Sequence, residues 1–348
     1  MVVGIELDKQ YIQVCVKTES MKDAESVSKI VGTEHYRMPV NCNIEEKKEL
    51  QKLFQDSWKL LKTYGSKEAL EFLVFCLEDN SEKMRTLLWE IVQMNHIPEE
   101  KVKFINKAES YCSYVFHQNP EFLSKSALLI ENVAGEKKKL LLFKRNIANH
   151  KVAETMDLTE EGLEEVFKDY QISSVFLVGD DYEEEWIQEN KKILKKGKRI
   201  FVGKNLFAKG ACYRALDLKN QRQGYVYLGP ETVSVDIGIK ALQDGEEICA
   251  PVLEGGKNWY ESDVSLEAIL MDEPVLEFYV APFSGKENKI VKVPLENLPV
   301  RPKKTTRLLI ELKLKNPTCA EFKIKDLGFG ELFPPTDMVY EGALQWDS

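Results

Sequence analysis

The spacing of apolar residues along the chain changes several times, and each change predicts a different element. Near the N-terminus, the β-branched runs VVGIEL and YIQVCVK flank the polar turn DKQ, which predicts a β-hairpin. A third strand is expected in ESVSKIVG at 25–32. From Asn43 the apolar residues recur every three or four positions, so a helix is predicted with Asn43 as its N-cap and Gly65 as its stop.

Strand and helix patterns then alternate up to about residue 120. Apolar runs at 70–77 (LEFLVFCL) and 101–105 (KVKFI) predict strands. A helix is predicted in SEKMRTLLWEIVQMN, opened by Asn80 or Ser81, and another from about Asn106. The first half of this region therefore reads βββαβαβα.

The same order recurs in residues 121–218. The predicted strands are SALLIEN, KKKLLLFKR, NHKVAETM, SSVFLVG and RIFVG, and the predicted helices are LTEEGLEEVFKDY, EEEWIQENKKILKK and NLFAKGACYRALDL. Eight elements that repeat in one order are harder to obtain by chance than any single assignment. An internal duplication over 1–120 and 121–218 is therefore the strongest organisational prediction.

The helical period disappears beyond the polar segment KNQRQG at 219–224, which is the expected linker between domains. Residues 225–348 alternate apolar and polar positions with period two, interrupted by Gly, Pro and Asn. This pattern predicts a separate antiparallel β-sandwich. The predicted fold class is thus a duplicated α/β domain over 1–218 followed by an all-β domain.

Composition narrows the class of protein. The chain is 43% hydrophobic and 30% charged, as in globular proteins, and its net charge of -9 argues against nucleic acid or an anionic membrane as the partner. Neither a secretory leader pattern nor an apolar run long enough to span a membrane occurs, so a cytoplasmic location is expected. The seven cysteines are scattered without a C-x-x-C pair and the four histidines are isolated. Reduced thiols and no metal site are therefore predicted.

A duplicated βββαβαβα unit resembles the actin-like (ribonuclease H-like) ATPases, in particular a reduced, degenerate bacterial-type relative of the seventy-kilodalton heat-shock chaperones. VVGIELDKQYIQV resembles the first phosphate loop, and SALLIENVAGEKKKLLLF lies where the second belongs. VFLVGDD with VGKNLFAKGACYRAL resembles the adenosine motif and the last helix, and the segment around INKAES resembles the connecting segment. The resemblance implies that the β-domain is similar to the chaperones' substrate-binding sandwich. It also implies a vestigial nucleotide cleft at Glu6, Asp8, Lys9, Gln10, Glu131, Gly135, Gly179, Asp180 and Gly210.

Several residues depart from the pattern of that family. In the second loop, Val133 and Ala134 stand where glycines would let backbone N–H groups approach a phosphate, and Glu136 adds a negative charge. Glu6 replaces the usual aspartate, and Asp180 replaces the second glycine of the adenosine motif. The segments after the third strand of each half are too short for the lobes that cover the cleft in the chaperones. No catalytic residue and no cofactor are therefore expected, and ATP with Mg would bind only if the cleft were still functional.

Other charged and aromatic motifs have simpler interpretations than ligand binding. Lys137, Lys138 and Lys139 are interpreted as the solvated edge of a hairpin, where lysines discourage strand addition. The acidic run from Asp180 to Glu185 is interpreted as a helix N-terminus, and GGKN at 255–258 as a turn. The aromatic residues of the β-domain are expected mainly in its core, although some could line a groove for an extended peptide.

The leading functional hypothesis is a chaperone-like protein or peptide-binding protein whose degenerate nucleotide site does not hydrolyse ATP. One alternative is a minimal active ATPase chaperone. Another is a structural or filament-forming actin-like subunit. A protein or peptide partner is expected, while the partner's identity and the oligomeric state stay open.

Overall fold

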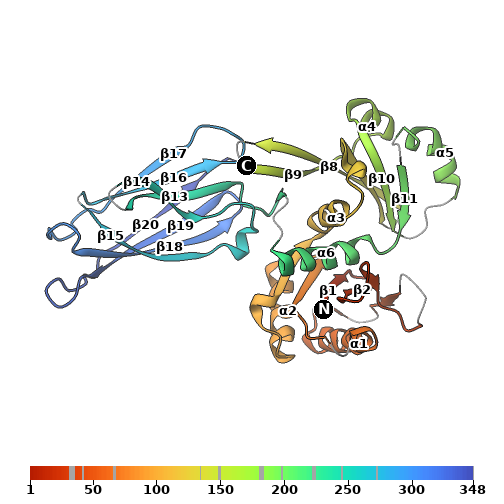
Figure 1. Cartoon of the computed structure of the whole chain (residues 1–348), viewed down its shortest axis with the longest axis horizontal. Helices are drawn as coiled ribbons and strands as arrows, with labels where there is room; N and C mark the ends of the chain where they lie inside the picture. The colour runs from red at the N-terminus through yellow and green to blue at the C-terminus, as the bar shows by residue number, and fades with distance from the viewer. Residues whose placement is uncertain are drawn as a thin grey trace. The chain divides into compact units, whose positions relative to one another are not determined.

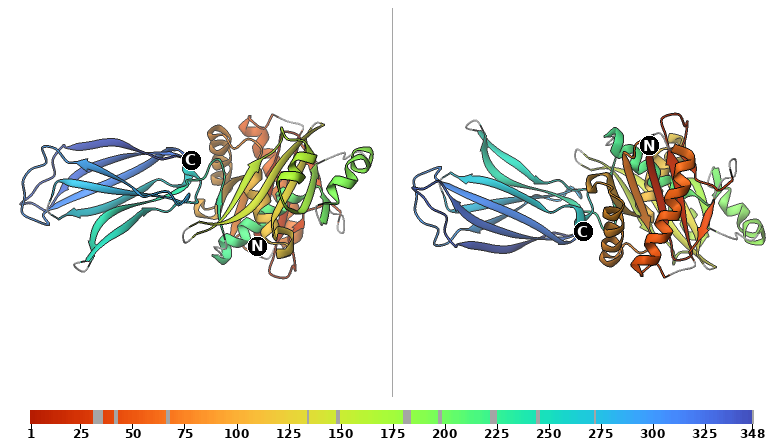
Figure 2. Two further views of the ribbon diagram at one scale, coloured as in Figure 1. Left: turned by 90° about the horizontal axis from the view of Figure 1, so that it is seen from above. Right: turned by 90° about the horizontal axis from the view of Figure 1, so that it is seen from below.

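The computed structural model describes residues 1–30, 36–40, 43–65, 68–133, 135–147, 150–179, 184–196, 199–221, 225–243, 246–271 and 273–347. Figure 1 and Figure 2 show the ribbon. The chain divides into two compact units: unit 1 is Met1–Lys144 with Ala153–Gly224, and unit 2 is Arg145–Val152 with Tyr225–Ser348.

The first sheet of unit 1 is built around a hairpin and two parallel strands. Its order is β3-β2-β1-β5-β6, and β4 also pairs with β2. β1 is antiparallel to β2 and parallel to β5, which is parallel to β6. The strands are β1 (Val2–Leu7), β2 (Tyr11–Lys17), β3 (Glu25–Ser26), β4 (Arg37–Pro39), β5 (Phe72–Leu77) and β6 (Val102–Asn106). The hairpin is confirmed, the third strand is shorter than predicted, and β4 was not predicted.

Three helices belong to this first half: α1 (Lys47–Gly65), α2 (Glu82–Met94) and α3 (Lys107–Phe116). α1 and α2 contribute Phe54 and Leu88 to the core cluster that covers one face of the sheet. Ser81 accepts a hydrogen bond from the backbone N–H of Met84 and caps α2. The prediction that Asn43 caps α1 was wrong: α1 begins at Lys47, and the Asn43 side chain accepts from the N–H of Glu45 in the preceding turn. Short polar side chains stabilise such turns as readily as helix starts.

The second sheet repeats the pattern of the first. Its order is β11-β10-β7-β8-β9-β12, with β7 antiparallel to β8 and parallel to β10, which is parallel to β11. The strands are β7 (Ser126–Val133), β8 (Glu136–Ile147), β9 (His150–Asp157), β10 (Ile172–Gly179), β11 (Arg199–Gly203) and β12 (Val226–Leu228). Thus β9-β8-β7-β10-β11 has the same order as β3-β2-β1-β5-β6. Because β8 has a strand on each side, the interpretation of its lysines as a hairpin edge was wrong.

The helices of the second half are α4 (Leu163–Asp169), α5 (Glu184–Leu194) and α6 (Leu206–Asn220). Val166 of α4 and Leu194 of α5 belong to the apolar cluster against the second sheet. α6 lies against β1 and α3 (Figure 1). The approach to β1 is close, because a Cβ on Gly4 would lie 2.2 Å from the backbone nitrogen of Cys212. None of the helices among the described residues is long and apolar enough to cross a membrane.

Unit 2 contains two antiparallel four-stranded sheets, β14-β13-β16-β17 and β15-β18-β19-β20. Their apolar faces share one core, in which the rings of Phe278 and Phe322 lie 5.4 Å apart. The strands are β13 (Val235–Gln243), β14 (Glu246–Leu253), β15 (Val264–Leu270), β16 (Val275–Pro282), β17 (Lys289–Pro294), β18 (Thr306–Asn316), β19 (Cys319–Gly328) and β20 (Val339–Gln345). β20 was not predicted. Short 3₁₀ turns lie at Glu99–Lys101, Pro120–Leu123 and Trp259–Glu261.

The packing of α6 on α3 gives a stability prediction. A Cβ on Gly210 would lie 2.0 Å from the backbone oxygen of Ser110, which cannot move without shifting α3. We expect Gly210→Ala to lower the free energy of unfolding by about 2 kcal/mol, measured by urea unfolding. Gly203→Ala is the control, because nothing lies within 4 Å of its added Cβ. Equal stability of the two variants would contradict this account of the interface.

Candidate functional site

The carboxyl ends of β1, β5 and β7 converge in unit 1 on the ammonium group of Lys107. Lys107 is the first residue of α3. The preceding residue, Asn106, is the last residue of β6 and the N-cap of α3, and its side chain accepts a hydrogen bond from the N–H of Glu109 at 2.8 Å. The Lys107 Nζ lies 2.7 Å from Glu131 Oε1 and 3.3 Å from Asp8 Oδ2, and it also forms an ion pair with Glu78. The Lys107 side chain is only 15% exposed. One cation therefore joins carboxylates from the first sheet, Asp8 and Glu78, and from the second sheet, Glu131.

The charge of this cluster is set by competition between burial and ion pairing. Burial lowers the pKa of Lys107, but the Glu131 and Glu78 carboxylates outweigh it and raise the pKa well above its ordinary value. Lys107 therefore stays protonated at any physiological pH. A second cation, Lys138 on β8, lies 3.7 Å from Glu78 and adds partial compensation.

Glu6 lies beside this cluster at the end of β1 and is 1% exposed. Burial raises its pKa to about 7, although Lys107, the Tyr11 hydroxyl and Arg37 each lower it, and the nearby Glu131 raises it further. The Tyr11 hydroxyl donates to Glu6 Oε1 at 2.7 Å, and the Arg37 guanidinium lies 4.1 Å from the centre of the Tyr11 ring. Glu6 is thus a carboxyl group whose charge changes near neutral pH.

The first predicted phosphate loop is a closed turn between β1 and β2. Asp8 accepts from the N–H of Gln10 at 3.0 Å, and its N–H donates to the carbonyl of Tyr11. Lys9 and Gln10 are exposed. Of the residues predicted in this loop, Asp8 belongs to the Lys107 cluster and Glu6 lies beside it. Gln10 contacts the cluster only through its backbone N–H on Asp8, and no bond to the cluster is described for Lys9.

The second predicted loop is the turn between β7 and β8. Gly135 there has a φ of +91°, and a Cβ on it would meet no atom within 4 Å, so its glycine serves the turn conformation alone. The Lys137 ammonium donates to Asn132 Oδ1 at 2.7 Å, and Lys139 donates to the carbonyl of Thr159. These lysines are therefore bound within unit 1. Ala134 lies outside the described residues.

The remaining predicted positions are divided between the cleft and the core. Gly179 is the last residue of β10 and has a φ of +117°. A Cβ at this position would lie 2.5 Å from the carbonyl oxygen of Asn132, so the glycine allows the end of β10 to pack closely on β7 next to Glu131. Gly210 packs on α3, and Asp180 lies outside the described residues. The predictions missed Lys107 and Glu78. The available signal was a pair of charged residues directly after two parallel strands, β5 and β6, since the carboxyl ends of parallel strands meet at one edge.

Among the described residues, His, Cys, Asp and Glu form no group of three or more arranged to hold a metal ion. The three carboxylates of the cluster surround an ammonium group instead. The ammonium group neutralises the carboxylates and holds the ends of their β-strands together.

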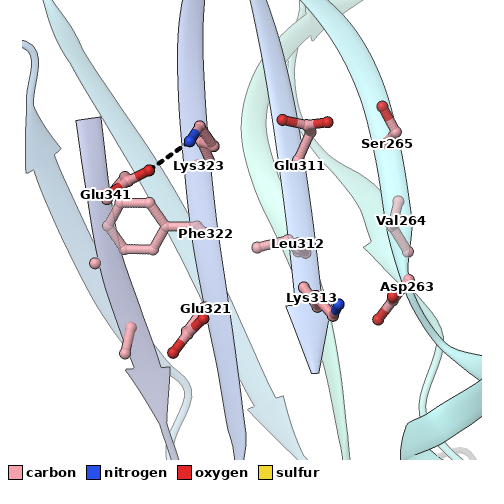
Figure 3. Close-up of a pocket in the computed structure, with 12 residues that line it drawn as sticks. Asp263, Val264, Ser265, Glu311, Leu312, Lys313, Glu321, Phe322, Lys323 and Glu341 are labelled. Carbon is pink, nitrogen blue, oxygen red and sulfur yellow. Dashed lines mark ion pairs between the residues drawn. The ribbon is translucent and has the colours of Figure 1, made fainter. Parts of the chain in front are cut away.

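Unit 2 carries a trough of about 860 Å³ on the sheet β15-β18-β19-β20 (Figure 3). Ser265, Glu311, Lys323 and Glu341 form one row across the strands, and Asp263, Lys313, Glu321 and Ala343 form the other. Lys323 and Glu341 are 2.6 Å apart. Of the aromatic residues considered for a peptide groove, Phe278 and Phe283 are buried and none lines the trough, whose aromatic lining residue is Phe322 of the core. The walls are thus charged.

Comparison with known families places the chain. Residues 26–230, more than half of it, match the model described as "Family of unknown function (DUF5716) C-terminal". The chain belongs to this family. Residues 232–346 match a second model, "Domain of unknown function (DUF8552)", so the two matches meet near the start of the β-rich region. No curated protein matches the chain.

The central role of Lys107 gives a second prediction. Lys107→Met removes the cation from three carboxylates whose side chains are each less than one third exposed. We expect a loss of about 3 kcal/mol in the free energy of unfolding. Lys59→Met is the control, because Lys59 forms an ion pair with Asp56 while 73% exposed, and its loss changes stability by less than about 0.5 kcal/mol. Unchanged stability of Lys107→Met would show that the cluster is not an anchor.

The raised pKa of Glu6 gives a pH prediction. The pKa of Glu6 rises from 4.5 in the unfolded chain to about 7 in the folded protein, so the folded state binds the proton more tightly. The fold therefore loses stability as the pH rises from 4.5 to about 7. A shift of this size corresponds to roughly 3 kcal/mol lost across that window. Glu6→Gln keeps a neutral side chain, so its stability should be nearly flat from pH 5 to pH 8 in urea unfolding.

A second acid serves to separate this effect from general acid unfolding. Burial raises the pKa of Asp326, but hydrogen bonds from Arg301, Gly328 and Thr336 outweigh it and hold that pKa at about 2. Asp326 therefore stabilises the fold fully above pH 3.8 and loses that stabilisation only as the pH falls from 3.8 towards 2, outside the window of Glu6. Parallel pH curves for the wild type and Glu6→Gln would refute the assignment to Glu6.

Proposed function

We propose that this chain is a non-hydrolysing relative of the actin-like ATPases, of the heat-shock chaperone type, that works by binding a protein or peptide partner. The repeated strand order of the two sheets in unit 1, with the same parallel and antiparallel pairings, supports the relationship. Fold alone does not define an activity. The functional part of the proposal therefore depends on the cleft.

The observation that carries the proposal is the ion-pair cluster around Lys107. A nucleotide phosphate placed at the ends of β1 and β7 would meet the carboxylates of Asp8 and Glu131, both of which are already bound to Lys107. A magnesium ion would have to displace that ammonium group. Catalysis of phosphoryl transfer needs the metal and phosphate held by groups positioned for them. Here the same groups are engaged with one another.

The short connections support the same conclusion. β9 ends at Asp157 and α4 begins at Leu163, so residues 158–162 cannot form a lobe over the cleft. Phosphoryl transfer is favoured in a site that excludes water. The protein-binding part of the proposal draws on unit 2, whose sheet β15-β18-β19-β20 carries a trough bordered by two rows of mostly charged side chains.

The test is a phosphate-release assay with Mg-ATP, run together with thermal unfolding. We expect no release above the protein-free blank and no change in melting temperature, because a ligand that binds the folded state must stabilise it. Release that falls in Glu131→Gln, or a magnesium-dependent rise in melting temperature, would contradict the proposal and favour an active ATPase chaperone.

A further inference from the structure

Three buried polar atoms next to the Lys107 cluster have no hydrogen-bond partner among the described residues: Glu6 Oε2, Gln13 Oε1 and Gln13 Nε2. Gln13 is fully buried. It lies directly opposite Glu6 in the pairing of β1 with β2, so both side chains project from the same face of the sheet. Buried polar groups almost always have partners, and a concentration of unpaired ones needs an explanation.

The N-terminus of α6 faces the same place. Gly4 lies against Ala208 and Cys212 of α6, and Cys212 donates to the carbonyl of Val2, so α6 runs antiparallel to β1. Glu6, two residues further along β1, therefore lies near the start of the helix. Arg37, which pairs with Gln13 across β2 and β4, donates to the carbonyl of Lys204 at the helix start.

The N-cap residue of α6, Asn205, does not cap the helix through its side chain. The amide nitrogen of Asn205 instead donates to Ser26 Oγ at 3.0 Å. The first N–H groups of a helix need external acceptors and carry partial positive charge. The first N–H groups of α6 are therefore donors that the side chain of its own N-cap residue does not satisfy.

We propose that Glu6, Gln13 and the first turn of α6 form an internal binding site for a small uncharged hydroxyl ligand, of which water is the smallest. A hydroxyl group donates one hydrogen bond and accepts two, so it can donate to Glu6 Oε2 or Gln13 Oε1 while it accepts from Gln13 Nε2 and a helix N–H. Water has two O–H groups and can donate to both oxygens. A cation would face Lys107 and Arg37, and an anion would face Glu6 and Glu131. This site goes beyond the proposed function and does not depend on whether a nucleotide binds.

Tyr111 provides a matched contrast. Its hydroxyl is also buried without a partner among the described residues, but it is solitary and its ring packs edge-on against Phe176. A lone polar atom in an apolar setting does not hold water, which needs two to four polar partners. Removing the Tyr111 hydroxyl should therefore stabilise the fold, because it removes the desolvation penalty of an unpaired buried group. Removing the Gln13 amide should destabilise the fold, because it breaks hydrogen bonds to the ligand.

The experiment compares Gln13→Leu with Tyr111→Phe in urea unfolding of the full chain. We expect Gln13→Leu to lower the urea midpoint and Tyr111→Phe to leave it unchanged or raise it. A raised midpoint in Gln13→Leu would overturn the proposal, because it would mean that the amide is buried without a ligand.

A crystal structure of the wild type keeps the test decisive if leucine fits poorly. We expect electron density for an oxygen atom within hydrogen-bond distance of both Glu6 and Gln13. Direct pairing of the two side chains with no such density would overturn the site. A titration with glycerol then distinguishes an organic hydroxyl ligand from water. A saturable rise in melting temperature in the wild type but not in Gln13→Leu identifies an organic hydroxyl ligand. The same change in melting temperature in both proteins, with the electron density present, identifies water.

Discussion

The ammonium group of Lys107 is the interaction on which the centre of unit 1 depends. Asp8, Glu78 and Glu131 come from the ends of three strands, and without a cation their mutual repulsion at short range would force those ends apart. Because Asp8 and Glu78 follow strands of the first sheet and Glu131 lies on a strand of the second, the lysine also joins the two sheets. Its own position is fixed by the Asn106 cap, which starts α3 at the edge of the first sheet.

This arrangement determines what the site can do chemically. Lys107 is ion-paired with three carboxylates of the protein, and under the proposed function these groups are engaged with one another rather than with a phosphate or a metal ion. Burial of Glu6 beside them, with a pKa of about 7, means that the local charge responds to pH. The combination fits a site that holds the structure together better than one that turns over a substrate. In that account the two sheets of unit 2, with their charged trough, are the part of the chain that meets a partner.

The repeated βββαβαβα pattern predicted most elements of unit 1, because apolar periodicity determines which residues become buried. β4 was missed because its three residues carry no period, and the seven-residue β20 was missed because Gly342 interrupts its apolar pattern. β8 was misjudged as an edge because strand neighbours are a property of the whole sheet. Glu6, Asp8 and Glu131 were predicted as cleft positions, but Lys107 was not. Its place directly after β6 was an available signal, whereas its ion pairs with Asp8 and Glu131 depend on the folded structure, in which β5 lies between β6 and β1.

The central claim is that intramolecular ion pairs have replaced nucleotide phosphate and metal in this cleft. Isothermal titration calorimetry of the full chain with ATP and magnesium tests it most directly. The account predicts only the heat of dilution, in the wild type and in Glu131→Gln alike. Saturable, magnesium-dependent heat in the wild type that disappears in Glu131→Gln would contradict it.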